Sequence, residues 1–387
     1  PGGGAMALPG TLLGGLPILT NLLAILTNAL PTCAVVHILV HSAQCNALLN
    51  LSVPVNPDPN LSVAQIAGYH PSQLASMYHL PTSGGSGNLV ATIVAGDDPT
   101  AENDLAVYRH AFGLPACTAS NGCFRKVNEQ GVSSSFPAAM SGWPQEAGID
   151  IEMISAVCPN CSILLVEVDS ADLSDLEAGV DVAARLGAVA INNSYYAPEY
   201  SSEVSEQQHF NHPGIEITAA SGDVGYGATF PASSSYVTAV GGTSMGLGLT
   251  ILQTVWAASG SGCSLYIAKP AWQHDSGCPN RTVGDMAAIA DPKTGVAVYN
   301  TTAPSGEVGW GVYGGTSVAA PVIAAAFALS ENKAGTIPAA YAYAHTSAFS
   351  AVLLGSNGSC SQAYLCNGGF GYRGPSGLGT PNGVGGL

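Results

Sequence analysis

The chain has 387 residues, of which 47% are hydrophobic and 9% are charged, whereas a globular protein is usually ~25% charged. Its 25 acidic residues outnumber its 9 Lys and Arg residues and give a net charge of −16, so the chain repels a phosphate backbone and we expect no nucleic-acid partner. Because so few cations allow few ion pairs, protonation of the carboxylates costs such a fold little stability. The composition therefore indicates an acidic working environment.

Residues 1–60 differ in composition from the rest of the chain. They are rich in Leu, Ala and Asn, nearly free of charge, and end in the Pro-rich stretch VPVNPDPN. We expect an apolar N-terminal extension and linker over 1–60 and a separate domain over 61–387. The apolar run at 10–30 is interrupted by Pro17 and two asparagines, so it predicts no membrane span, and it lacks the basic flank of a signal peptide. Since the chain starts with Pro1, we expect a processed form.

From about residue 65 onward, apolar runs alternate with amphipathic segments. Four short runs have the composition of buried strands, and the segments between them have helical periodicity. This alternation predicts an α/β fold with a mostly parallel central sheet, helices on both faces, and the chemistry at the carboxyl ends of the strands. The expected strands are 88–96, 162–168, 189–194 and 215–221, and the expected helices are 102–114, 145–158, 174–187 and 203–212.

The ten cysteines form five pairs of near neighbours along the chain. An even count in local pairs predicts disulfides, an oxidising compartment and hence a secreted protein. The alternative is a zinc or redox site at the CxxC pair Cys158 and Cys161, but no second CxxC motif and no nearby His pair completes a zinc site. The expected pairs are Cys33–Cys45, Cys117–Cys123, Cys158–Cys161, Cys263–Cys278 and Cys360–Cys366.

The phrase GGTS occurs twice and offers two candidate nucleophiles, Ser244 and Ser317. Ser317 precedes the apolar helical run VAAPVIAAAFALS, in which Pro321 fits a first helical turn. A serine at the mouth of a buried helix has free N–H groups and a dipole that stabilise an anion; the alternative role is a helix N-cap. Ser244 completes a G-x-S-x-G pattern, but a turn and a strand are expected after it instead of a helix. We therefore interpret Ser244 as a structural turn residue.

No histidine stands in a recognisable catalytic motif, so the proton acceptor for Ser317 is expected to be a carboxylate, which suits an acidic pH. Glu146 and Asp150 are four residues apart on an expected helix and share one face, where two close carboxyl groups share a proton. The alternative is an ordinary solvated acidic face. Asp223 follows the expected strand 215–221 among glycines, and it is either a turn residue or, when protonated, a hydrogen-bond donor to an oxyanion.

Taken together, these residues and their motifs resemble the sedolisin family of serine-carboxyl peptidases. The resemblance covers about 65–387 and implies a subtilisin-like fold with a peptidase domain. It also implies Ser317 as nucleophile, Glu146 as its general base, Asp150 as the orienting acid and Asp223 as the oxyanion-hole donor. The matching stretches are GGTSVAAP, WPQEAGIDIE, SGDVG, FPASSSYVTAVGGTS, HPSQLASMYHLP, INNSY, RTVGDMAAIADPKTGVAVY and GLGTPNG.

The sequence departs from the family pattern in two places. Sedolisins usually bind calcium near the C-terminus through two aspartates, and Ala351 and Arg373 stand where those acids would be. A hard cation has few charged ligands there, so we expect no calcium and no other cofactor, with the Arg373 guanidinium in its place. The family also carries a long folded prosegment, and residues 1–60 are too short and unlike it; we expect them to pack on the domain or to mediate self-assembly.

The leading hypothesis is a secreted endopeptidase that hydrolyses polypeptide substrates at acidic pH through an acyl-enzyme. An esterase that uses Ser244 is a weaker alternative, because the helix that the motif requires is missing. A structural alternative is a surface or filament-forming protein that keeps the peptidase fold as a scaffold, since apolar residues 1–60, low charge and many disulfides suit assembly.

Overall fold

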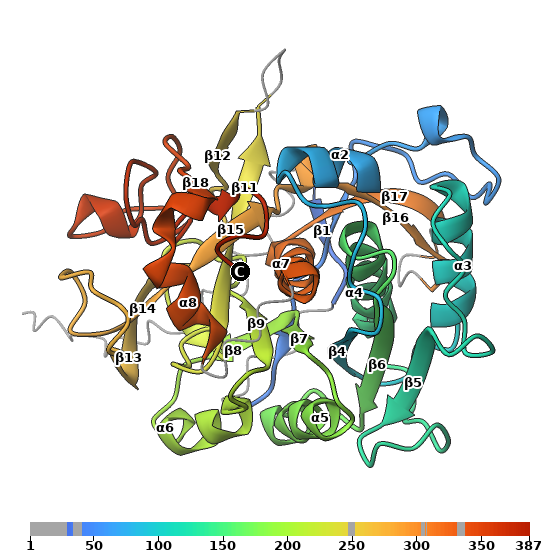
Figure 1. The fold of residues 1–387 in the computed structure, drawn as a ribbon, viewed down its shortest axis with the longest axis horizontal. Coiled ribbons are helices and arrows are strands. Elements are labelled where there is room, and N and C mark those ends of the chain that lie inside the picture. The colour runs from blue at the N-terminus through green and yellow to red at the C-terminus, as the bar shows by residue number, and fades with distance from the viewer. Residues whose placement is uncertain (1–28, 34–40, 247–251, 303–305, 307, 331–336) are drawn as a thin grey trace, which may run out of the picture.

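A central sheet of eight strands organises the protein (Figure 1). The computed structural model describes residues 29–33, 41–246, 252–302, 306, 308–330 and 337–387. The strands follow the order β12–β11–β9–β7–β4–β6–β5, with β15 paired to β11. Every neighbouring pair is parallel except β11 and β12, which confirms the predicted mostly parallel sheet. The strands are β4 (Leu89–Ala95), β5 (Phe124–Asn128), β6 (Ser162–Val168), β7 (Ala190–Asn193), β9 (Glu216–Ala220), β11 (Thr238–Met245), β12 (Gln253–Val255) and β15 (Met286–Ile289).

Helices cover both faces of this sheet. α4 (Trp143–Val157) and α7 (Thr316–Ser330) pack against each other and on the sheet, and Figure 1 shows α5 (Leu173–Arg185) on the opposite side of the strands. α7 is apolar all round and buried along almost its whole length, as expected of a helix enclosed on every side. The other helices are α2 (Pro71–Met77), α3 (Ala101–Ala111), α6 (Glu203–Glu206), α8 (Pro338–Ala344) and the short 3-10 turns Val63–Gln65, Gln207–Phe210, Pro292–Thr294, Thr346–Ala348 and Ala363–Leu365.

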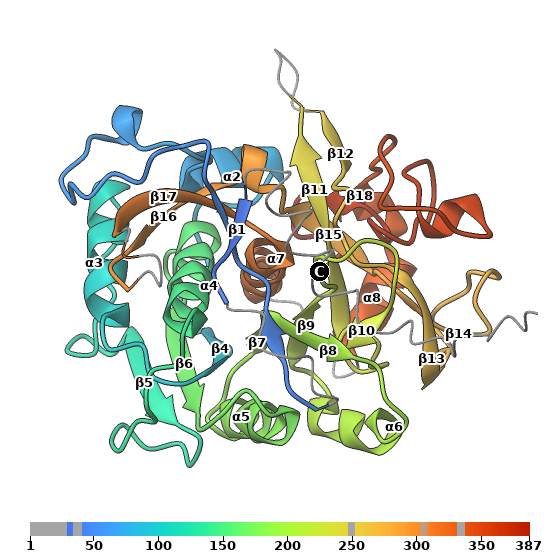
Figure 2. The ribbon, with the colours of Figure 1, turned by 180° about the vertical axis from the view of Figure 1, so that it is seen from behind.

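Two smaller sheets attach the N-terminal segment to the rest of the protein. β3 pairs with β1 on one side and with β17 on the other, and β17 continues to β16. β2 pairs with β8, which also pairs with β10. Figure 2 shows this blue segment passing α4 and α7 between β17 and β8. The described part of 1–60 therefore packs on the domain, and these strands are β1 (Ala29–Pro31), β2 (Gln44–Cys45), β3 (Leu48–Asn50), β8 (Tyr195–Pro198), β10 (Thr229–Phe230), β16 (Val296–Asn300) and β17 (Gly309–Gly314).

Five disulfides connect the cysteines in the expected pairs. They join Cys33–Cys45, Cys117–Cys123, Cys158–Cys161, Cys263–Cys278 and Cys360–Cys366. The CxxC pair is thus a disulfide, so the zinc alternative for it is wrong. The fourth of them closes the hairpin of β13 (Gly262–Ala268) and β14 (Asn280–Val283), while β18 (Phe349–Ser350) pairs with β19 (Thr380–Pro381). Within the described ranges, no helix is both long enough and apolar enough to cross a bilayer.

Two helix predictions differ in detail from the structure. The expected helix 203–212 is divided into α6 and a 3-10 turn over Gln207–Phe210, where the Gln207 side chain donates to the Val204 carbonyl at 3.2 Å and competes with the regular helical bonds. Pro321 lies in the second turn of α7 and not in its first, because the helix already begins at Thr316.

Candidate active site

Ser317 is the second residue of α7 and is fully buried. The preceding Gly315 has a φ of 103°, and a Cβ at that position would lie 1.9 Å from the carbonyl oxygen of Asn46, so only glycine fits. Ser317 Oγ accepts a hydrogen bond from the Asn46 N–H at 3.2 Å and donates one to the Ser194 carbonyl at 3.3 Å. Because Ser317 lies inside the helix, the N-cap alternative for it is wrong, and its hydroxyl lies beside the free N–H groups of the first turn.

Glu146 reaches the same place from α4. Its Oε2 accepts hydrogen bonds from the Asn46 N–H at 3.1 Å and from the Ala47 N–H at 3.0 Å. Since the Asn46 N–H also lies 3.2 Å from Ser317 Oγ, the carboxyl group of Glu146 and the hydroxyl group of Ser317 are neighbours. Two residues far apart along the chain, on two packed helices, thus share one hydrogen-bond donor, the Asn46 N–H.

Asp150 lies one helical turn after Glu146 and is held by hydroxyl groups from the sheet. Its Oδ2 accepts from Thr92 Oγ1 at 2.5 Å, and its Oδ1 accepts from Ser194 Oγ at 2.6 Å. Asn192 Nδ2 donates to both of these hydroxyls, at 3.1 and 2.8 Å. Glu146 and Asp150 are both fully buried, so the alternative of a solvated acidic face is wrong.

Sequence reasoning did not assign Thr92, Asn192 or Ser194. Thr92 is the one polar residue of β4, and Asn192 and Ser194 lie two residues apart in the stretch INNSY. A polar side chain inside an apolar strand needs a hydrogen-bond partner when it is buried. That rule marks these three residues as bonded to something, but the sequence does not show that the partner is Asp150.

Asp223 follows β9 and lies next to the start of α7. Its Oδ1 accepts from the Thr316 N–H at 2.9 Å and from Thr316 Oγ1 at 2.7 Å. Its Oδ2 has no hydrogen-bond partner among the described residues and lies 2.8 Å from where a Cβ of Gly315 would be, the same point that the Asn46 carbonyl approaches. The structure therefore gathers Ser317, Glu146 and Asp223 around the segment Asn46–Ala47, and Asp150 lies one helical turn from Glu146.

Burial dominates the acidity of these carboxyl groups. It raises the pKa of Glu146 well above its usual range, the Asp150 carboxylate raises it further, and the neighbouring Ser317 hydroxyl and the Ala47 N–H oppose the rise. Burial likewise raises the pKa of Asp150, against the hydrogen bonds of Ser194 and other groups. The pKa of Asp223 is raised to about 7 for the same reason, so this group is protonated at acidic pH and its free oxygen can donate a hydrogen bond.

We expect the protein to be more stable at pH 4 than at pH 8. Burial raises the pKa of Asp98 to about 6, of Asp223 to about 7 and of Glu216 to about 8, whereas carboxyl groups of an unfolded chain titrate near ~4. At a pH between the pKa of the unfolded chain and the higher pKa of the folded protein, the folded protein binds more protons than the unfolded chain. Its free energy of unfolding therefore falls as the pH rises through this range. Thermal unfolding followed by circular dichroism should give a melting temperature roughly 5–10 °C lower at pH 8; a rise over this range would contradict the argument.

The other candidate nucleophile, Ser244, lies inside β11 and not in the expected turn. It is extended because β12 returns antiparallel beside it and pairs Ser244 with Thr254. Its hydroxyl donates to Asp291 Oδ2 at 2.7 Å. A strand position offers no helix N-terminus to an oxyanion, which agrees with a structural role.

The two positions that would supply the family's calcium ligands do not fit a calcium ion. Ala351 follows β18 and has no side-chain oxygen. The Arg373 guanidinium lies over Gly369, where a Cβ would be 2.6 Å from it, and its Nε donates to the Phe370 carbonyl at 3.0 Å. The positively charged Arg373 and the methyl side chain of Ala351 offer no carboxylate, so a calcium ion would lack its charged ligands at these two positions.

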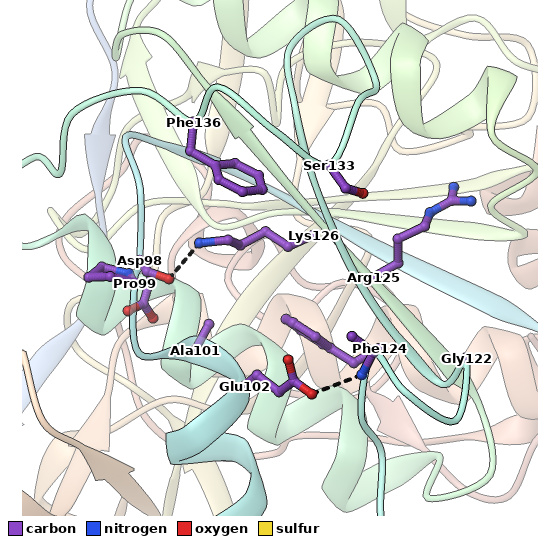
Figure 3. Close-up of a pocket in the computed structure, with 11 residues that line it drawn as sticks. Asp98, Pro99, Ala101, Glu102, Gly122, Phe124, Arg125, Lys126, Ser133 and Phe136 are labelled. Carbon is purple, nitrogen blue, oxygen red and sulfur yellow. Dashed lines mark hydrogen bonds between the residues drawn. The ribbon is translucent and has the colours of Figure 1, made fainter.

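A separate pocket of about 450 Å³ lies beside β5 and the start of α3, and none of the four predicted site residues lines it (Figure 3). Lys126 crosses it, donates to the Asp98 carbonyl at 2.9 Å and lies 4.3 Å from the centre of the Phe136 ring. Lys126 also forms ion pairs with Asp97 at 2.5 Å and Glu167 at 3.3 Å. Its charge is therefore already balanced by the protein.

No protein-family model matches the chain, but three curated proteins are similar to it. Kumamolisin of Bacillus sp. (strain MN-32) is 28% identical over 359 residues, which cover 82% of this chain and 62% of that protein. Xanthomonalisin of Xanthomonas sp. (strain T-22) is 25% identical over 389 residues, covering 81% and 46%. Sedolisin of Pseudomonas sp. (strain 101) is 33% identical over 185 residues, covering 42% and 29%. The chain thus spans less than two thirds of the length of these relatives.

Solved structures show the same architecture. A Pseudomonas sedolisin, a serine-carboxyl proteinase complexed with two molecules of pseudo-iodotyrostatin, superposes with a TM-score of 0.70 at 23% identity, over 82% of this chain and 96% of that one. A lanthipeptide protease superposes with a TM-score of 0.50 at 14% identity, over 81% and 91%. These likenesses confirm the predicted subtilisin-like α/β fold.

Proposed function

Since the chain belongs to the sedolisin family, we propose that it is a serine-carboxyl endopeptidase that acts at acidic pH through an acyl-enzyme. One observation carries the proposal: the Asn46 N–H lies 3.1 Å from Glu146 Oε2 and 3.2 Å from Ser317 Oγ. A single donor within reach of both atoms places a carboxylate beside a hydroxyl at a helix N-terminus. Activation of a serine nucleophile requires that arrangement.

In the proposed reaction Glu146 acts in its ionised form, which becomes more stable when water and substrate enter the site and reduce the burial that raises its pKa. Ser317 Oγ then attacks the carbonyl carbon of the scissile bond while Glu146 takes its proton. Asp150, fixed by the hydroxyls of Thr92 and Ser194, orients Glu146 and shares the pair's proton. The developing oxyanion accepts hydrogen bonds from protonated Asp223 and from the Ser317 N–H. Glu146 then gives the proton to the leaving amine, and water releases the acyl group by the same steps in reverse order.

Replacing Glu146 by glutamine tests the base directly. The side chain keeps its size but no longer accepts a proton, so we expect kcat to fall roughly 10²- to 10⁴-fold and the acidic limb of the pH–rate profile to disappear. Glu152→Gln is the matched control, because Glu152 is also buried in α4 but bonds the Tyr299 N–H at 3.0 Å, away from Ser317. If the pH–rate profile of Glu146→Gln keeps the acidic limb of the wild-type profile, Glu146 is excluded as the base.

Polypeptide substrates and an extracellular location belong to the same proposal. Kumamolisin, xanthomonalisin and sedolisin are peptidases of this family, and five disulfides are typical of an oxidising compartment. The alternative of a filament-forming protein gains no support, because the described part of residues 1–60 pairs with strands of its own chain.

We also propose that the peptidase works without calcium at the family position. Metal analysis of the purified protein should find well below one calcium ion per chain, and a chelator should leave its melting temperature unchanged within ~1 °C. The reason is the donor set at Ala351 and Arg373, which offers no carboxylate. Tightly bound calcium in a 1:1 ratio would overturn this prediction.

A further inference from the structure

The proposed catalytic residues are covered by the protein's own chain. The covering segment is residues 41–50, called the strap here, and Figure 2 shows it in blue beside α4 and α7. Asn46 and Ala47, at its centre, are 3% and 1% exposed, and Ser317 and Glu146 beneath them are 0% exposed. No substrate can reach Ser317 while the strap is in place.

The strap pairs with the edges of two sheets in the same manner as a bound peptide substrate would. On one side of the site, Gln44 and Cys45 pair antiparallel with Tyr196 and Tyr195 of β8. On the other side, β3 of the strap pairs antiparallel with the end of β17, with Leu48 opposite Gly314. Strand addition of this kind is a general mode of peptide recognition. Between the two paired stretches only Asn46 and Ala47 remain, and they lie opposite Ser317.

The bond between Asn46 and Ala47 has the orientation of a scissile bond. The Ala47 N–H donates to Glu146 Oε2 at 3.0 Å, so the carboxyl group that would return a proton to the leaving amine already lies beside that nitrogen. A Cβ on Gly315 would lie 1.9 Å from the Asn46 carbonyl oxygen and 2.8 Å from Asp223 Oδ2, so these two oxygens are close to each other. Asp223 Oδ2, the proposed oxyanion donor, has no hydrogen-bond partner among the described residues. Both ends of this peptide group therefore face the groups that would act on them.

Both sides of this bond are anchored to one further segment, residues 29–33. The disulfide Cys33–Cys45 holds the side before the bond. The side after it is held because the Thr32 N–H and Oγ1 donate to the Ala47 carbonyl at 3.0 and 3.3 Å and because β1 pairs with β3. The anchor in turn packs on the start of α4, where a Cβ on Gly142 would lie 2.4 Å from the Cys33 Cα.

We propose that the strap is a tethered inhibitor of the peptidase site, bound as a substrate at Asn46–Ala47 and retained by the Cys33–Cys45 disulfide. This inference rests on the proposed function. If Ser317 Oγ attacks the Asn46 carbonyl carbon, the bond to the Ala47 nitrogen breaks and that nitrogen takes a proton. Because the anchor holds both new ends, the amine attacks the acyl group again, restores the peptide bond and returns the proton to Ser317. The strap therefore occupies the site without leaving it.

Opening the disulfide tests this inference. We compare the full chain with its Cys33→Ser/Cys45→Ser variant at acidic pH, using a fluorogenic peptide library for turnover and hydrogen exchange of the strap amides for occupancy. Loss of a ring of 12 residues weakens retention by roughly 10- to 100-fold, so we expect turnover to rise by that factor and the strap amides to exchange faster. N-terminal sequencing of the variant should then find a new chain start at Ala47. When Ser317→Ala is added to the same variant, this new chain start should no longer appear.

Two further variants keep the test decisive. Cys263→Ser/Cys278→Ser removes a disulfide that spans a similar length, 15 residues, between β13 and β14, and should leave turnover and strap exchange unchanged. Leu49→Asp displaces β3 from β17 without touching any disulfide, and should raise turnover even if the first variant folds poorly. A wild-type chain that turns over peptide as fast as variants with a released strap overturns the inhibitor role. A released strap with no turnover in any variant overturns the proposed peptidase function instead.

Discussion

Replacing Ser317 by alanine lowers kcat/KM for a peptide substrate by roughly 10⁴- to 10⁶-fold, the loss typical of a serine nucleophile. The neighbouring Ser194 hydroxyl is not placed to substitute for it, since it donates to Asp150 Oδ1 at 2.6 Å and lies 3.3 Å from the Ser317 carbonyl oxygen. The measurement is run on the full chain and on the Cys33→Ser/Cys45→Ser chain in parallel, so that a covered site is not mistaken for an inactive one.

Ser244→Ala is the matched control for this experiment. Both serines follow Gly-Gly-Thr, and each donates one hydrogen bond in the structure, Ser244 to Asp291 and Ser317 to the Ser194 carbonyl. The loss of either bond costs about 1 kcal/mol of stability, so the two variants should melt alike while differing by several orders of magnitude in kcat/KM. A large loss of activity in Ser244→Ala with a nearly unchanged Ser317→Ala would favour the esterase-type alternative.

The elements that carry the proposed site could be predicted because their signals are local. The apolar run after Ser317 and the spacing of Glu146 and Asp150 each depend on residues within a few turns of one helix. The disulfides are equally local, with sequence separations of 3 to 15 residues. Short-range patterns of this kind predict local structure without knowledge of the overall fold.

The strap could not be predicted, because nothing in residues 1–60 has a period of two or a turn signal that marks strands as short as β2 and β3. Their partners, β8 and β17, lie far along the chain, so the pairing depends on the finished fold. The hydroxyls that hold Asp150 were missed for the same reason: Thr92 of β4 and Ser194, which directly follows β7, come together only because β4 and β7 pair in the folded sheet. Sequence reasoning thus found the acids and the serine but not what surrounds them.

Replacing Arg281 by methionine is expected to destabilise the protein strongly. Arg281 and Asp285 are both fully buried and form a bidentate pair, with Nη1 2.8 Å from Oδ1 and Nη2 2.5 Å from Oδ2. Asp285 also accepts from the Ala239 N–H at 2.7 Å and from the Tyr343 hydroxyl at 2.9 Å, so it ties β11 and β15 to α8. Without Arg281 it becomes an unpaired buried charge, which costs about 3–5 kcal/mol.

The chain has only nine Lys and Arg residues, and a second ion pair provides the comparison. Lys126→Met breaks the pair with Asp97, whose side chain is 21% exposed. Its other partner, Glu167, has a pKa raised to about 9 by burial, so it is protonated at neutral pH and leaves no unpaired buried charge. We therefore expect a loss of only about 1 kcal/mol. In denaturant titrations followed by fluorescence, Arg281→Met should therefore unfold at a clearly lower midpoint than Lys126→Met. Adding Asp285→Asn to Arg281→Met removes the unpaired charge and should restore most of the loss, because asparagine still accepts from Ala239. Failure of that rescue would show that the guanidinium acts through its packing on Trp272, 5.0 Å away, and not through the charge it balances.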